Sequence, residues 1–393
     1  MKQVLGWIVK RASNPESGLG PPAGWFTAPL LGRTCREHVR QAMEDGGACV
    51  AEDERAFEEP FDVVLLARED APCLEPAALA ALAAAAGTAP AEPLMSPRQE
   101  AVAVAIPRAE WLQAAKARSL PAGELALMLL HARDGQPESA SHPLPQSCEA
   151  AGPGQSGSVT LTDAAGYAAA FRALRQRIVW GHIAAGVILP DPDRVIIEAD
   201  VVIGPGAVIY PDNLLMGRTS VGAGCTLYPG SRLENASVGE GCVVEHSVLA
   251  DCSVGACTTV GPFAYLRPGT AVGSHCRVGD FVEVKNSNVG DHTKISHLTY
   301  VGDGDLGRNV NLGCGVVFVN YDGKAKQRCT VEDDAFVGCN CNLVAPVTVG
   351  KDAYVAAGST VVADVPPGAL YMARSRGEIK EGWVARRKEK GKL

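Results

Sequence analysis

The chain has 393 residues, which is too long for one ordinary domain and predicts two or three. Hydrophobic residues make up 47% and charged residues 20%, a composition that excludes a largely disordered protein. The net charge of −8 argues against a nucleic-acid-binding protein, which would carry a basic face. The basic run at residues 386–392 is interpreted as a solvated tail that could touch a phosphate-bearing ligand.

The distribution of cysteines and the lack of long apolar stretches indicate the cellular compartment of the protein. The thirteen cysteines are scattered without CxxC pairs, and several stand at repeat positions that favour a small apolar side chain. No stretch reaches about 18 apolar residues, and the N-terminus lacks the apolar core of a signal peptide. The sequence therefore predicts a soluble, reduced, cytoplasmic protein that contacts neither membrane nor nucleic acid.

The first 150 residues alternate short apolar runs with helical patterns. The expected strands are Phe61–Ala67 and Ala101–Ile106, and the expected helices are Glu75–Gly87, Glu110–Ala117 and Gly123–Gly135. Strands that alternate with helices predict a small α/β domain with a mostly parallel sheet at residues 1–150.

Residues 151–192 are expected to connect this domain to the rest of the chain. Residues 135–158 are rich in Gly, Pro and Ser, which is typical of a linker. Thr162–Gly186 then predicts a helix, with Thr162 or Asp163 as its N-cap.

An aliphatic residue returns every six positions over most of residues 193–365, with a few shorter steps and one break at the loop that begins at Asn320. The expected interior positions are Ile197, Ile203, Ile209, Leu215, Val221, Leu227, Leu233, Val238, Val244, Val248, Val254, Val260, Leu266, Val272, Val278, Val284, Val289, Ile295, Val301, Leu306, Leu312, Val331, Val337, Leu343, Val349, Val355 and Val361. A six-residue period fits neither a helix nor a hairpin sheet, and it is typical of a hexapeptide β-helix with three hexapeptides per coil. Residues 366–393 would form a C-terminal tail.

Polar residues in this array predict a site. Arg267 and Lys285 are 18 residues apart, one full coil, so they should stack about 5 Å apart and attract an anion such as a phosphate. The alternative is two solvated cations. The loop that begins at Asn320 interrupts the repeat and carries Lys326, a further candidate for phosphate binding.

His297 is the candidate general base. It stands in the segment SHLTY, with Tyr300 nearby and Glu283 expected on an adjacent face to supply a carboxylate. The alternative is a metal site shared by His292 and His297, although no clean ligand triad can be identified.

Several segments resemble the acetyltransferase half of a known bacterial family. These segments are VGPFAYLRPG, VGDFVEVKN, SHLTYVGD, NVNLGCG, NYDGKAK, FVGCNCNLVAPVTVG and KEGW, and the resemblance extends from Ala184 to the C-terminus. The family is the bifunctional N-acetylglucosamine-1-phosphate uridylyltransferase/glucosamine-1-phosphate N-acetyltransferase. The resemblance implies a left-handed parallel β-helix, a homotrimer with sites between subunits, and acetyl-CoA-dependent N-acetylation of glucosamine 1-phosphate in the synthesis of UDP-N-acetylglucosamine, a cell-wall precursor.

The resemblance also assigns residue roles. His297 would be the general base, and the sugar phosphate would be held by Arg267, Lys285, Tyr300, Asn311 and Lys326. The positions that correspond to acetyl-CoA contacts are Cys314, Asn320, Tyr321, Cys339, Ala357 and Arg374. Cys314 stands where the family often has Ala and Cys339 where it often has Ser, two small changes that backbone contacts would tolerate.

The first 150 residues resemble the family's uridylyltransferase only in outline. Asp70 would correspond to its magnesium-binding aspartate, and Thr162 or Asp163 stands where an Asn usually completes the metal site. The Gly-rich, Arg-bearing loop that grips the triphosphate is missing from the N-terminus. We therefore expect a degenerate nucleotidyltransferase-like domain, with Mg²⁺ needed only if uridylyltransferase activity is retained.

Three other functions stay open at the level of sequence. The chain could be bifunctional and use UTP with Mg²⁺, or it could be a non-catalytic assembly protein that binds a sugar nucleotide. A metal-dependent hydratase on the same fold would need stoichiometric zinc between subunits. The exact amino-sugar acceptor is not determined by these residues.

Overall fold

The computed structural model describes residues 3–9, 30–53, 56–57, 61–68, 71, 73–86, 94–95, 101–118, 126, 129 and 164–392. The chain divides into two compact units, residues 1–181 with 196–200 and residues 182–195 with 201–393. Asp70, Thr162, Asp163, residues 135–158 and most of Gly123–Gly135 lie outside the described residues. In the described part, no helix combines the length and apolar character that a membrane crossing requires.

The N-terminal unit contains a five-stranded sheet in the order β2-β1-β3-β5-β4. Its strands are β1 (Val4–Val9), β2 (Cys49–Val50), β3 (Val63–Arg68), β4 (Leu94–Met95) and β5 (Ala101–Pro107). The expectation of a mostly parallel sheet is wrong. β1 pairs in parallel with β2 and β3, whereas β5 runs antiparallel to both β3 and β4. The sheet is therefore mixed.

Three of the expected helices are confirmed in this part of the chain, and one helix is an addition. They are α1 (Cys35–Asp45), α2 (Pro76–Ala85), α3 (Arg108–Arg118) and α5 (Ala164–Ala184). The strands β1, β2 and β4 and the helix α1 were not expected from the sequence patterns. α1 begins at a capping box, in which the Thr34 hydroxyl accepts from the Glu37 N–H and the Glu37 carboxylate accepts from the Thr34 N–H.

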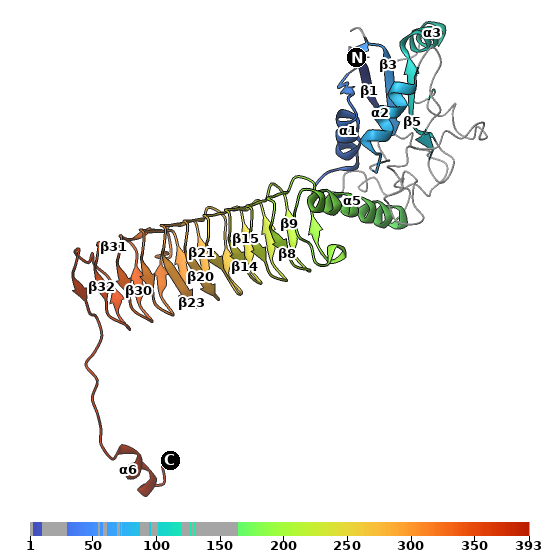
Figure 1. The fold of residues 1–393 in the computed structure, drawn as a ribbon. Helices are drawn as coiled ribbons and strands as arrows, with labels where there is room; N and C mark the ends of the chain where they lie inside the picture. Colours follow the sequence, from blue (N-terminus) through green and yellow to red (C-terminus); the bar gives the residue numbers. More distant parts are fainter. Residues whose placement is uncertain are drawn as a thin grey trace. The chain divides into compact units, whose positions relative to one another are not determined.

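The second unit is a parallel β-helix, whose successive coils are seen as a row of short strands in Figure 1. A short 3₁₀ turn (Pro192–Arg194) precedes it. The first ladder contains β7 (Val202–Ile203), β10 (Ser220–Val221), β13 (Ser237–Val238), β16 (Ser253–Val254), β19 (Ala271–Val272), β22 (Asn288–Val289), β25 (Gly304–Leu306), β28 (Cys329–Val331) and β31 (Val347–Val349).

The other two faces are ladders of ten strands each. The second ladder contains β8 (Val208–Ile209), β11 (Thr226–Leu227), β14 (Val243–Val244), β17 (Thr259–Val260), β20 (Arg277–Asp280), β23 (Lys294–His297), β26 (Asn311–Leu312), β29 (Phe336–Val337), β32 (Tyr354–Val355) and β34 (Leu370–Tyr371). The third contains β6 (Ile196–Ile197), β9 (Leu214–Met216), β12 (Arg232–Glu234), β15 (Val248–Ala250), β18 (Tyr265–Leu266), β21 (Glu283–Lys285), β24 (Tyr300–Gly302), β27 (Val317–Val319), β30 (Asn342–Val344) and β33 (Thr360–Val361). The final helix is α6 (Trp383–Glu389).

The interior of the β-helix confirms the six-residue pattern with two differences. Leu249, not Val248, is the interior residue of β15, because it is fully buried and pairs with Leu233 and Leu266. The chain therefore takes two five-residue steps there, from Val244 to Leu249 and on to Val254. Phe318, which the predicted pattern omitted, is fully buried directly before the inserted loop. Each such buried aliphatic or aromatic side chain contributes about 1.5–3 kcal/mol.

Candidate active site

One column of residues lies along the corner at which the strands of the second ladder end. Its members each stand two residues after an interior aliphatic, and the interior residues pair in the order Val278–Ile295–Leu312–Val337–Val355. We call this set the base column, and its members are Asp280, His297, Cys314, Cys339 and Ala357. The column thus places the predicted base in line with three of the positions that the family resemblance assigns to acetyl-CoA.

Small residues keep the base column tightly stacked. Gly313 and Gly338 precede Cys314 and Cys339, and a Cβ on either glycine would lie within 2.6 Å of a backbone nitrogen in the next coil. Backbone hydrogen bonds of 2.8 Å join neighbouring coils, from Asn340 N–H to the Cys314 carbonyl and from Gly358 N–H to the Cys339 carbonyl. The Cys339 side chain is exposed. The corner therefore offers a straight, rigid edge to a ligand.

His297 has a carboxylate partner, although not the one that the sequence predicts. Its Nδ1 lies 2.5 Å from Asp280 Oδ1, one coil away, and the hydrogen bond lowers the pKa of Asp280. Glu283 instead accepts a 2.7 Å hydrogen bond from Arg267 Nη1. The expectation that Glu283 supports the base is wrong, because its ladder places it beside Arg267 and not beside the imidazole.

Arg267 and Lys285 stack one coil apart, as their spacing predicts. Leu266 pairs with Val284, and Arg267 N–H donates to the Val284 carbonyl at 2.8 Å. Lys326 reaches the same place from the inserted loop, and the neighbouring Lys285 ammonium lowers its pKa. Three cations therefore gather on one face, which favours binding of an anion.

A buried aspartate that was not expected from the sequence, Asp303, holds this group together. Asp303 is 4% exposed and accepts from Lys285 Nζ at 3.2 Å, from Asn286 Nδ2 at 2.6 Å and from Asn320 Nδ2 at 2.5 Å. Burial raises the pKa of Asp303, but these hydrogen bonds lower it further, so the net direction is downward. Asp303 follows Lys285 by 18 residues, so the spacing rule used for Arg267 and Lys285 could have found it.

Tyr300 and Asn320 close around a glycine in this network. Asn320 Nδ2 lies 3.5 Å from the Tyr300 hydroxyl, and Asn320 is 7% exposed. A Cβ on Gly302 would lie 2.3 Å from that hydroxyl and 2.6 Å from Asn320 Nδ2. Only glycine leaves room for the two side chains. The structure therefore brings Tyr300 and Asn320 together with Lys285 and Lys326.

The inserted loop folds on itself and is fixed at its far end. The Asp322 carboxylate accepts from the N–H groups of Lys324 and Ala325, both at 2.7 Å, and the Tyr321 hydroxyl donates to the Gly323 carbonyl at 2.8 Å. Arg328 anchors the exit of the loop to the β-helix. No spacing signal in the sequence identifies Arg328, since its contacts depend on how the loop folds.

The remaining predicted residues differ in their distance from this site. Asn311 belongs to the ladder of β23 and pairs with Lys294, so it is on a different face from Arg267 and Lys285. Arg374 Nη1 donates to the Ala357 carbonyl at 3.2 Å and so lies at the end of the base column. The proposed metal-site partner His292 stacks on the ring of His275 with 4.9 Å between centroids, at the opposite end of β23 from His297.

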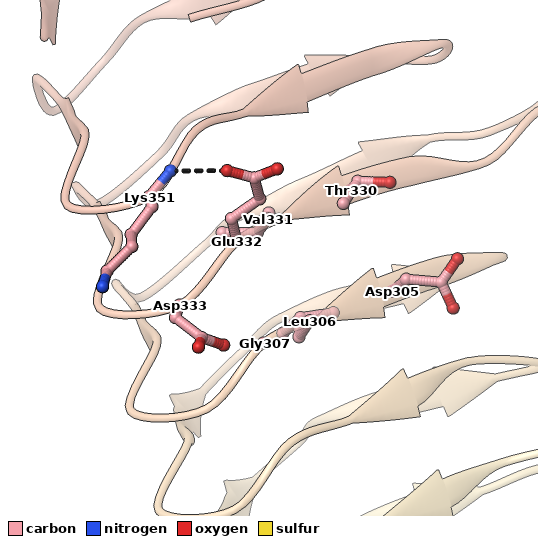
Figure 2. Close-up of a pocket in the computed structure, with 8 residues that line it drawn as sticks. All are labelled: Asp305, Leu306, Gly307, Thr330, Val331, Glu332, Asp333 and Lys351. Carbon is pink, nitrogen blue, oxygen red and sulfur yellow. Dashed lines mark hydrogen bonds between the residues drawn. The ribbon is translucent and has the colours of Figure 1, made fainter. Parts of the chain in front are cut away.

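The first ladder carries a separate, acidic concavity. Figure 2 shows its lining, in which Glu332 and Asp333 stand near Lys351 and Asp305 lies at the other end. The backbone N–H of Lys351 donates to the Glu332 carboxylate at 2.8 Å. None of the residues predicted for the acetyltransferase site lines it. In the part of the chain that the structure describes, no group of three or more His, Cys, Asp or Glu side chains could hold a metal ion.

Sequence comparisons match several bacterial proteins that are named bifunctional protein GlmU. The bifunctional protein GlmU of Acetivibrio thermocellus is 51% identical over 227 residues, which are 58% of this chain and 49% of that protein. That of Clostridium acetobutylicum is 49% identical over 213 residues, 54% of this chain and 47% of that protein. This chain is similar to bifunctional GlmU proteins. It spans about half the length of the curated relatives it matches, and no protein-family model matches it.

Solved structures give a weaker similarity. A UDP-N-acetylglucosamine acyltransferase of Francisella novicida matches 52% of this chain and 74% of its own, with 18% identity and a TM-score of 0.31. A hexapeptide-repeat acetyltransferase of Vibrio cholerae complexed with acetyl coenzyme A matches 33% of this chain and 71% of its own, with 21% identity and a TM-score of 0.22. Because both scores are low, the β-helix is established by the strand pairing described above.

Proposed function

We propose that the chain is an N-acetyltransferase that transfers the acetyl group of acetyl-CoA to the amine of glucosamine 1-phosphate. One observation carries the proposal. His297 stands in the same column as Cys314, Cys339 and Ala357, so a thioester bound along this corner ends beside an imidazole that a carboxylate contacts. The product would enter the synthesis of UDP-N-acetylglucosamine. The similarity to GlmU proteins over about half their length supports the same reaction.

The three cations Arg267, Lys285 and Lys326 suit the acceptor of this reaction. Arg267 can bind a phosphate through two parallel N–H bonds, and Lys285 and Lys326 add two ammonium groups. The Asp303 carboxylate fixes Lys285 and Asn320, so the anion site is organised before the substrate arrives. This arrangement would orient the sugar by its phosphate and leave its amine free to approach the base column.

The reaction would be a direct transfer between two bound substrates. The amine nitrogen attacks the thioester carbonyl carbon, a C–N bond forms, and the C–S bond breaks to release coenzyme A. His297 takes the proton that the amine loses and returns it to the leaving sulfur. Mg²⁺ belongs only to a retained uridylyltransferase activity, whose expected ligand Asp70 is outside the described residues.

The test is release of coenzyme A thiol from acetyl-CoA with glucosamine 1-phosphate, measured in EDTA. We expect turnover by the wild type and a loss of about 10²- to 10⁴-fold in His297→Ala, because a general base contributes that much. His275→Ala is the matched control, since this exposed histidine stands at another corner and should keep full activity. Absence of turnover from a folded wild-type protein would overturn the proposal.

A further inference from the structure

Asp280 and His297 are held together by backbone as well as by side chains. Asp280 ends β20, His297 ends β23, and the two are register partners one coil apart. The Leu298 N–H donates to the Asp280 carbonyl at 2.9 Å, next to the 2.5 Å contact between the side chains. Both side chains therefore leave a regular ladder, which fixes their relative position better than a loop would.

The contact determines which imidazole nitrogen is free. An ionised carboxylate can only accept hydrogen bonds, so the proton of neutral His297 must be on Nδ1, the atom that faces Asp280. Nε2 then keeps its lone pair and can accept a proton. When Nε2 is protonated, the nearby carboxylate stabilises the positive charge of the imidazolium.

We propose that Asp280 is the positioning residue of the general base in acyl transfer. It sets the Nδ1–H tautomer of His297, aims Nε2 at the acceptor amine, and stabilises the imidazolium that forms when the amine proton is transferred. This inference rests on the proposed function of the site. It assigns to Asp280 the role that the spacing in the sequence gave to Glu283.

Among the charged groups around His297, Asp280 is the carboxylate that contacts the imidazole ring. On the elements around the pair, Arg277 of β20 and Lys294 of β23 are register partners, and Arg277 helps lower the pKa of Asp280. The adjacent strands of this ladder, β17 and β26, carry no charged residue. Glu283 of β21 is bound to Arg267.

The experiment compares Asp280→Asn, Asp280→Glu and Glu283→Gln by steady-state kinetics across pH. For Asp280→Asn we expect kcat to fall about 10- to 100-fold, with each KM within about twofold and the acid limb of the profile moved to lower pH. Asp280→Glu should recover part of kcat. Glu283→Gln should instead change the KM for the sugar phosphate through Arg267. The exposed Glu240→Gln is the charge-matched control and should behave as wild type.

Failure of the inference can be told from failure of the proposed function. If the wild type acetylates and His297→Ala does not, an Asp280→Asn variant with wild-type kcat and pH profile overturns the role of Asp280 alone. Nitrogen-15 NMR of the histidine rings gives a readout that needs no turnover. We expect the Nδ1–H tautomer for His297 in the wild type and its loss in Asp280→Asn, and an unchanged tautomer would also overturn the inference.

Discussion

At the scale of single residues, each side chain of the site finds its partner in the adjacent coil of the β-helix. Asp280 and His297 are 17 residues apart, and Lys285 and Asp303 are 18 apart, yet both pairs are in direct contact. Coil length therefore varies, and a fixed spacing identifies some partners and misses others. A spacing of 18 residues correctly predicted that Arg267 stacks on Lys285. The coil between Asp280 and His297 has 17 residues, so the same spacing did not identify Asp280 as the partner of His297.

Cys339 allows a residue-scale test of the acetyl-CoA position. Its thiol is exposed in the base column, so bound acetyl-CoA should cover it and slow its alkylation by N-ethylmaleimide at least several-fold. The measurement is the rate of modification of each cysteine by peptide mass spectrometry, with and without acetyl-CoA. Cys49 and Cys257 are exposed outside the column and serve as internal controls. Equal protection of all three, or of none, would contradict the placement.

At the scale of elements, the inserted loop depends on one arginine. Arg328 Nε and Nη2 donate to the two carboxylate oxygens of Asp305 at 2.8 and 2.6 Å, and its guanidinium also donates to the carbonyls of Asn286 and Gly304 at 3.1 Å. These contacts join the loop exit to two coils of the β-helix. Lys326 is only two residues away, so the position of this cation follows from the anchor.

Removal of the Arg328 anchor should weaken binding of the sugar phosphate more than it slows the acetyl transfer step. We expect Arg328→Ala to raise the KM for glucosamine 1-phosphate about tenfold with kcat nearly unchanged, because Lys326 is no longer held beside Lys285. Arg328→Lys should not restore binding, since an ammonium cannot reproduce the planar fork. Arg308→Ala, which removes an exposed contact to Asp333 in another part of the β-helix, is the matched control. A fall in kcat alone would argue against this role.

At the scale of the whole molecule, the proposed site is divided between faces. Asn311 is on the ladder of His297, whereas Arg267 and Lys285 are on the third ladder. Phe263 and Phe281 stack with 5.4 Å between ring centroids, and both are more than half exposed at the corner next to the base column. Exposed stacked aromatic rings are typical of a surface that another chain covers.

We propose a homotrimer with sites between subunits, as the family resemblance implies. The expected mass in solution is about 123 kDa, three times the 40.9 kDa of one chain. Light scattering coupled to size exclusion measures it. Phe281→Ser should lower the mass and the activity together, because it removes apolar surface from the proposed interface. A monomeric wild type with full activity would refute this assembly.

The sequence alone determined the architecture of the second unit and named most residues of the proposed site. An aliphatic residue every six positions has no other stable arrangement than a coil that turns its aliphatic side chains inward. Spacing also placed Arg267 above Lys285, and the motifs selected His297, Asn320 and Lys326. Local patterns sufficed here because each coil contacts only the coils beside it.

Only the tertiary structure decided the contacts that depend on strand order and coil length. The N-terminal sheet is mixed because β5 runs antiparallel to β3. The direction of a strand depends on how the whole unit folds and cannot be read from the sequence of either strand. Leu249 replaces Val248 in the interior because the chain takes two five-residue steps there, and a shift of one residue turns the side chains of β15 to the opposite face. A separate 17-residue coil, from Val278 to Ile295, gives His297 the carboxylate of Asp280. Glu283 pairs with Tyr265 across a full 18-residue coil and contacts Arg267.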